Sequence, residues 1–159
     1  MLKFLVLNHF FENYEILEKN TEKHKNIQVF NFRFGDKNET IDIFLSEDDE
    51  NFGEGFFSEI GGVSDKKVKC DIKNIKDVLL DLKIEVIDLI KIDTKGAEFD
   101  ILTSLDEDVL RNVKWMTGEL HGYKDFELLS YLQNFGFNIG LRKSINNRLF
   151  MFHTIDNQT

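Results

Sequence analysis

Two short groups of polar residues carry most of the chemistry that this sequence can offer. The first is the run from Lys91 to Glu98, in which Asp93 follows a long apolar, β-branched stretch and Gly96 permits a tight turn. The second is Glu119-Leu120-His121, whose two polar side chains are two residues apart and therefore point to the same side of a strand. Carboxylates and an imidazole at strand ends suit acid–base chemistry on a bound substrate.

The Glu119 and His121 pair is open to several interpretations. A histidine held by a carboxylate can deprotonate a substrate hydroxyl, because imidazole accepts protons near neutral pH. Alternatively, the two side chains form a satisfied polar pair at the end of a strand. Together with Asp93 they could also supply the two carboxylates and one histidine of a metal site. Three ligands inferred across two elements are a weak signal, so no metal is expected from the sequence.

The two acids of the first group also have structural explanations. Asp93 could bind a cofactor or substrate, or it could cap the helix expected after Gly96. Glu98 lies in the first turn of that helix, where an acid compensates the positive end of the helix dipole. A functional role is therefore not needed to explain either residue type at its position.

Composition limits the classes of partner. The chain has 159 residues, of which 42% are hydrophobic and 31% charged, as expected of a single globular domain over residues 1–159. Its formal net charge of −9 should repel phosphate backbones, which argues against nucleic acid. The single Cys70 excludes an intramolecular disulfide and fits a reducing cytoplasm. No stretch reaches the roughly 18 apolar residues of a spanning helix, so no membrane insertion is expected.

Strand and helix patterns alternate along the chain, which predicts a three-layer α/β fold. The apolar stretch Ile84–Ile92 is the strongest candidate for a strand buried on both faces of a parallel sheet. The segment Ser46–Ser64, rich in acids and glycines, is expected to be a long mobile loop. Strands are expected at 3–7, 27–32, 40–45, 66–72, 113–120, 138–142 and 148–153, and helices at 13–24, 75–82, 96–105, near 108 and at 126–135.

The order of these elements predicts a mostly parallel sheet that closes on an antiparallel hairpin at its C-terminal end. In such open sheets, ligands bind beyond the carboxyl ends of the strands. If the strands ending at Ile92 and Leu120 are adjacent and parallel, Asp93 and the Glu119–His121 pair come together. That crevice is the expected site.

The run from Asp88 to Leu102 resembles the D-x-x-K-I-D-V-E-G-A-E-x-x-V-L signature of FkbM-type S-adenosylmethionine-dependent methyltransferases. Glu12–Asn20 resembles that family's helix after its second strand, Gly35–Lys37 resembles one of its turns, and Glu119 with His121 resembles its later E-x-H. The resemblance extends from about Lys3 to His153 and implies a Rossmann-like methyltransferase fold. Complete members transfer a methyl group from S-adenosylmethionine to a hydroxyl oxygen, often of a sugar or a small natural product.

The resemblance also assigns roles to particular residues. It implies that Asn8, Asp93 and Glu98 contact the cofactor and that Asp93, Glu119 and His121 form the catalytic group. Asn8 stands where the family has a glutamate that grips the cofactor ribose, so the charge-assisted part of that contact is lost. Lys95 replaces another family glutamate.

In the family, a first strand and a D-x-G-A-N-x-G loop would precede the segment that begins at Met1, so the resemblance implies a domain that is incomplete at its N-terminus. That strand would lie between the strands ending at Leu7 and Ile92, and its absence leaves two edges for a second copy or a partner chain to cover. With half of the cofactor site missing, the isolated chain is expected to bind S-adenosylmethionine at millimolar dissociation constants or not at all, no more than about 4 kcal/mol.

The sequence is also compatible with two other functions. The chain could be a non-catalytic or truncated remnant that serves as an interaction domain. It could also be a nucleotide- or sugar-binding module that uses the same crevice.

Overall fold

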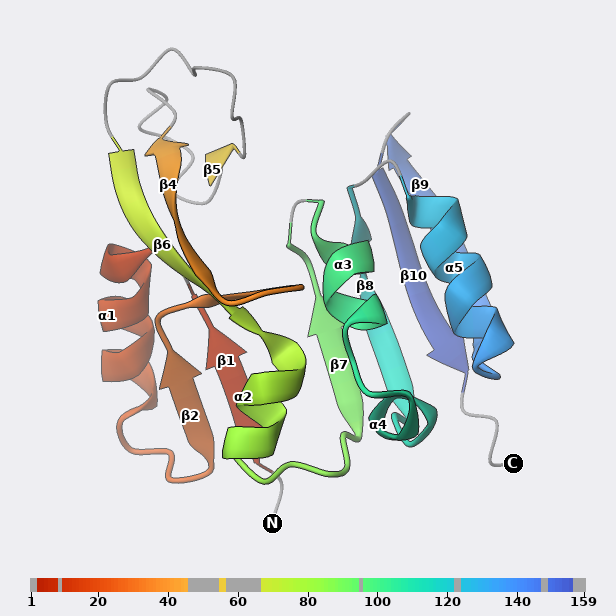
Figure 1. Ribbon diagram of the computed structural model, residues 1–159, viewed down its shortest axis with the longest axis horizontal. Coiled ribbons are helices and arrows are strands. Elements are labelled where there is room, and N and C mark those ends of the chain that lie inside the picture. The colour runs from red at the N-terminus through yellow and green to blue at the C-terminus, as the bar shows by residue number, and fades with distance from the viewer. Residues whose placement is uncertain are drawn as a thin grey trace. The chain divides into compact units, whose positions relative to one another are not determined.

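The computed structural model describes residues 3–8, 10–45, 55–56, 67–94, 96–121, 124–146 and 149–155. The chain divides into two compact units, Met1–Lys73 and Asn74–Thr159, and each is described by itself. The mixture of strands and helices confirms the predicted α/β class (Figure 1). Among the described residues the longest helix has 11 residues, and none combines the length and hydropathy needed to cross a bilayer.

Among the described residues, the first unit contains one helix, and all of its strands lie in two small sheets. Its elements are β1 (Phe4–Leu7), α1 (Phe11–Thr21), β2 (Ile27–Phe30), β3 (Arg33–Gly35), β4 (Glu39–Leu45), β5 (Gly55–Phe56) and β6 (Lys67–Asn74), the last of which reaches into the second unit. β1 pairs with β2 in parallel, and the second sheet has the order β3-β6-β4-β5. A Cβ at Gly35 would lie 2.5 Å from a methyl of Ile72, so glycine allows the close approach of β3 and β6.

The second unit contains the larger part of the core. Its elements are α2 (Ile75–Asp81), β7 (Leu89–Ile92), α3 (Glu98–Thr103), α4 (Glu107–Arg111), β8 (Trp115–Leu120), α5 (Asp125–Asn134), β9 (Asn138–Asn146) and β10 (Leu149–Ile155). The sheet order is β7-β8-β10-β9, and Figure 1 shows α3 and α5 over one face of this sheet. Apolar side chains of the sheet and the two helices are buried there: Ile92, Ile101, Leu102, Met116, Leu120, Leu128, Leu132 and Phe152.

Local sequence explains where the helices of the second unit begin and end. Asn74 caps α2 by accepting a hydrogen bond from Lys76 N at 2.9 Å, and Asp106 caps α4 by accepting from Asp108 N at 3.2 Å. At the end of α5, Gly136 has φ +91°, and Phe137 N donates to Leu132 O at 3.1 Å. A glycine in this left-handed conformation is a common way for a helix to end.

The sheets are parallel only in part. The β1–β2 and β7–β8 pairs are parallel, whereas β4 is antiparallel to β5 and β6, and β10 is antiparallel to β8 and β9. The predicted hairpin at the C-terminal end is confirmed. The prediction of a mostly parallel sheet is therefore confirmed only in part, because apolar periodicity marks a strand without giving the direction of its neighbour.

The expectation that Ile84–Ile92 is buried on both faces was also wrong. The strand begins only at Leu89, which is 57% exposed, and within β7 only Ile92 is buried. Among the described residues β7 pairs with β8 alone, so it is an edge strand, and α3 covers one of its faces. An apolar run therefore predicted the strand correctly but not its depth in the sheet.

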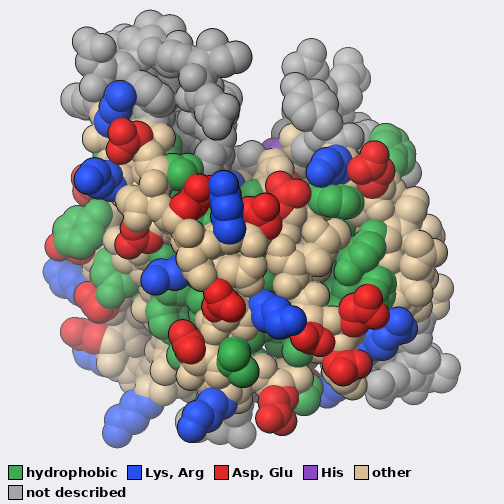
Figure 2. Space-filling view, in the orientation of Figure 1, with side chains coloured by type: hydrophobic (Ala, Val, Ile, Leu, Met, Phe, Trp, Pro, Cys, Tyr) green, Lys and Arg blue, Asp and Glu red, His purple; other side chains and the backbone are tan. Residues whose placement is uncertain are grey.

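The predicted loop Ser46–Ser64 lies outside the described residues, except for Gly55 and Phe56, which pair with β4. On the face drawn in Figure 2, acidic and basic side chains of the described residues are interspersed rather than gathered by sign.

Candidate functional site

The carboxyl ends of β7 and β8 bring the two polar groups together, as the sequence predicts. The two strands are parallel, with Ile92 opposite Gly118, so Asp93, just after β7, and Glu119, near the end of β8, lie at the same level. A Cβ at Gly118 would collide with the carbonyl oxygen of Ile92, which means that glycine lets the strands approach closely at this point. The pairing of β7 with β8, and the glycine at its close point, thus place the two groups side by side.

His121 is the centre of the site. Its Nε2 lies 3.6 Å from Asp93 Oδ1 and 3.6 Å from Glu119 Oε2, while its Nδ1 lies 3.3 Å from Glu98 Oε1. The imidazole is only 11% exposed, whereas the Asp93 and Glu119 side chains are 34% and 32% exposed. The histidine therefore contacts one acid through Nδ1, and its Nε2 lies near two partly exposed acids.

Glu98 is the buried acid of this group, with a side chain only 2% exposed. Its carboxylate accepts hydrogen bonds from Thr94 N at 2.9 Å and from Gly96 N at 3.0 and 3.2 Å. Gly96 has φ +112°, a conformation that favours glycine, and it turns its N–H toward the carboxylate. Backbone donors thus offset the cost of burying the acid, and the same acid orients the imidazole.

The contact with Glu98 determines how the imidazole can act. An ionised carboxylate can only accept a hydrogen bond, so Nδ1 carries the proton in the Glu98 contact. In the neutral ring, Nε2 then has its lone pair directed toward Asp93 and Glu119. It can accept a proton from a substrate or coordinate a cation.

Asp93, Glu119 and His121 also have the composition of a metal-ligand set. One ligand atom each from Asp93, Glu119 and His121 lies within 4.8 Å of the other two. Within the described part of the chain, it is the one group of three His, Cys, Asp or Glu residues whose ligand atoms lie that close together.

Asn8, the remaining predicted cofactor contact, belongs to the first unit. It follows β1, and its Oδ1 accepts a hydrogen bond from Phe10 N at 3.0 Å at the entrance to α1. Its backbone oxygen accepts from Asn31 Nδ2 at 2.9 Å. The side chain thus stabilises the turn into α1, and its contact with a cofactor stays a prediction.

Sequence reasoning missed two features of the site. It named Glu98 as a cofactor contact but did not anticipate its contact with His121, for which the sequence gives no spacing signal. It also passed over Gly118, although a glycine inside a strand often marks a close backbone approach.

Comparisons with known proteins give the family of the chain. The model of the "Methyltransferase FkbM domain" matches residues 5–139. A curated relative, the AMB antimetabolite synthetase AmbE of Pseudomonas aeruginosa, is 32% identical over 82 residues, which cover 47% of this chain and 4% of the synthetase.

A solved structure, methyltransferase FkbM of Methylobacillus flagellatus KT, is similar in fold with a TM-score of 0.62 at 15% identity. The match covers 94% of this chain and 36% of that chain, so this chain spans about a third of the solved protein. Because the family model matches more than half of the sequence, the chain belongs to the methyltransferase FkbM domain family.

Proposed function

We propose that this domain transfers a methyl group from S-adenosylmethionine to a hydroxyl oxygen of a sugar or small natural product, and that the acceptor hydroxyl binds at His121. Family membership supports methyl transfer. The name of AmbE, an antimetabolite synthetase, supports a small-molecule acceptor, although this chain spans only 4% of that protein. The observation that carries the proposal is the His121 imidazole, held by buried Glu98 with Nε2 toward the partly exposed end of the sheet.

Asp93 and Glu98, the two predicted cofactor contacts in the second unit, differ in their fit. When bound, S-adenosylmethionine supplies a methyl group that leaves its sulfur without the bonding electron pair. Asp93, at the end of β7 and 34% exposed, has a carboxylate that can accept a hydrogen bond from a cofactor hydroxyl or amine. Glu98 is buried and occupied by backbone donors and His121, so we assign it to positioning.

His121 acts as the base in this proposal. Nε2 takes the proton from the acceptor hydroxyl, which leaves the oxygen electron pair free to form the new bond to carbon. The ring becomes a cation, and the carboxylates of Asp93 and Glu119, each 3.6 Å from Nε2, stabilise that charge. Glu98 keeps the ring from rotating.

The test measures transfer of radiolabelled methyl groups from S-adenosylmethionine to a panel of sugars and hydroxylated natural products, using the protein that contains this domain. His121→Ala should lower kcat by about 10²–10⁴-fold, the usual contribution of a positioned base. The matched control is His24→Ala, because His24 is an exposed histidine in the first unit. Folded protein that transfers no methyl group to any acceptor, or a His121→Ala variant with unchanged kcat, would contradict the proposal.

A second candidate is an interaction domain without catalysis, covered by a second copy or another chain. It is favoured by the strand edges, because among the described residues β1 pairs only with β2 and β7 only with β8. Open strand edges can add a strand from a partner. Stable self-association in light scattering, together with no methyl transfer, would favour this candidate over the enzyme.

A further inference from the structure

We propose that Asp93, Glu119 and His121 form a binding site for one divalent transition-metal ion, of the Mn²⁺ class. The site itself rests on geometry alone, whereas its use in activating a hydroxyl rests on the function proposed above.

Distances between the ligand atoms fit a shared ion. Ligand atoms that bind one ion at about 2.1 Å lie about 3.0–3.4 Å apart in octahedral or tetrahedral geometry. Nε2 lies 3.6 Å from each of the two carboxylate oxygens, and all three atoms lie within 4.8 Å of one another. Small rotations of two partly exposed carboxylates would therefore complete the coordination.

The imidazole is prepared for coordination by its other nitrogen. Metal-bound histidines commonly donate their second ring N–H to a carboxylate, which fixes the tautomer and the ring orientation. Glu98 occupies that position, 3.3 Å from Nδ1, and is itself held by the backbone N–H groups of Thr94 and Gly96. This contact is made by Nδ1 and is separate from the two carboxylates near Nε2.

Charge also favours a cation between these groups. The carboxylates of Asp93, Glu98 and Glu119 surround one imidazole that is only 11% exposed. A proton on Nε2 would offset one negative charge, whereas a divalent ion offsets two and is shared by Nε2 and the two nearby carboxylate oxygens.

The ligand set selects the class of ion. Two carboxylate oxygens suit Mg²⁺ and Mn²⁺, whereas imidazole favours the transition metals over Mg²⁺. Three protein ligands leave further positions open, and these can bind the oxygen of a hydroxyl acceptor. In the metal-bound state Nε2 is a ligand rather than a base, so the ion would stabilise that oxygen while the hydroxyl proton passes to solvent water.

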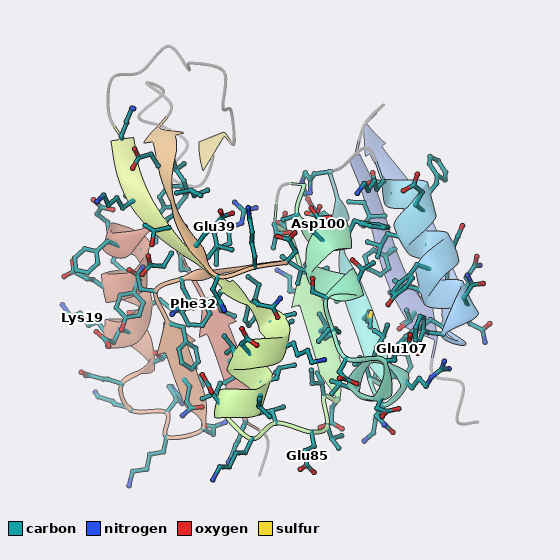
Figure 3. All side chains as sticks on the ribbon, in the orientation of Figure 1. Lys19, Phe32, Glu39, Glu85, Asp100 and Glu107 are labelled. Atoms are coloured by element: carbon teal, nitrogen blue, oxygen red, sulfur yellow. The ribbon has the colours of Figure 1, made fainter. Side chains whose placement is uncertain are left out.

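The experiment titrates the protein into Mn²⁺ and follows the free-ion signal by electron paramagnetic resonance. We expect saturable binding of one Mn²⁺ per chain, competed by Zn²⁺. His121→Ala and Glu119→Gln should abolish it, and Glu98→Gln should weaken it about 10–100-fold, as removal of an orienting partner does at metal sites. Asp100→Asn is the matched control, because Asp100 lies on α3 with Glu98 and pairs with Lys124 at 3.8 Å (Figure 3).

The outcomes separate this inference from the proposed function. No saturable binding, or binding that survives both His121→Ala and Glu119→Gln, would overturn the metal site. Circular dichroism of each variant shows that any loss of binding occurs in folded protein. Mn²⁺ binding at these residues without methyl transfer would support the site and contradict the proposed enzyme. Methyl transfer by folded protein that shows no saturable Mn²⁺ binding would support the enzyme and overturn the site.

Discussion

The two units contain the same local arrangement, a parallel strand pair joined through helix, but they use it differently. In the first, β1 leads through α1 to β2, and no residue of α1 is fully buried. In the second, β7 leads through α3 and α4 to β8, and α3 buries Glu98, Ile101 and Leu102. The polar residue after β1 serves a turn, whereas the acid after β7 joins a cluster around His121. Of these two strand ends, the one after β7 is followed by a helix whose buried face holds a polar group, Glu98.

The largest expected difference concerns the two helices themselves. Leu102 on α3 is 0% exposed, and Ile16 on α1 is 59% exposed. Leu102→Ala should lower the free energy of unfolding by about 2–5 kcal/mol, because it removes buried methyl groups and leaves a cavity. Ile16→Ala should change it by less than about 0.5 kcal/mol, as expected at the surface. Urea denaturation of both variants measures this, and similar losses would remove the contrast between the helices.

Alanine substitution of the two glycines at which strands approach closely should also reduce stability more in the second unit, at Gly118, than in the first, at Gly35. A Cβ at Gly118 meets the backbone oxygen of Ile92, whereas a Cβ at Gly35 meets a side-chain methyl of Ile72. A methyl group can rotate away but a paired strand cannot, so Gly118→Ala should cost about 1–3 kcal/mol and Gly35→Ala less. Thermal unfolding of the two variants decides the order. A greater loss for Gly35→Ala would show that β7 and β8 separate more easily than we infer.

Two threonine hydroxyls provide a third pair. Thr154 is fully buried, and its Oγ1 accepts a hydrogen bond from Met116 N at 2.8 Å, while exposed Thr40 donates to Asp71 Oδ1 at 2.7 Å. Thr154→Val should cost about 1–3 kcal/mol, because it leaves a buried N–H without its acceptor. Thr40→Val should cost little, since water replaces the lost partner. Equal effects in chemical denaturation would contradict this difference in burial.

The smallest expected effects are at the extremes of pH and differ in sign. The hydrogen bond from Lys76, with a further one from Asp108 N, lowers the pKa of Asp106 below 3.8. Its contribution to stability is present above that pH and is lost as the pH falls through the lowered value. In α1, the hydrogen bond to Glu18 raises the pKa of Tyr14 above 10.0, so its contribution is present below pH 10 and is lost as the pH rises further.

Stability curves of Asp106→Asn and Tyr14→Phe check these signs. The first variant should lose part of the acid-side dependence, and the second part of the alkaline-side dependence. If Asp106→Asn kept the full acid-side dependence of stability, or Tyr14→Phe the full alkaline-side dependence, the corresponding contact would not form in solution.

Much of the second unit could be predicted from sequence. The helical spacing of α5 and the meeting of Asp93 with His121 follow from residue types and strand order. Two aspects could not be predicted. The edge position of β7 depends on which strands pair, and an apolar run carries no information on that. The Glu98–His121 contact joins residues 23 positions apart, and only the tertiary structure brings them within 3.3 Å.

The most direct test of the account is a comparison of steady-state methyl transfer by His121→Ala and Asn8→Ala, one strand-end residue from each unit, in the protein that contains this domain. We predict that His121→Ala lowers kcat by at least about 10²-fold with little change in the KM for S-adenosylmethionine, as loss of a base requires. Asn8→Ala should instead leave kcat nearly unchanged and, if Asn8 contacts the cofactor, raise that KM. A His121→Ala variant with wild-type kcat, or a larger loss of kcat in Asn8→Ala, would contradict the claim that the chemistry lies at the ends of β7 and β8.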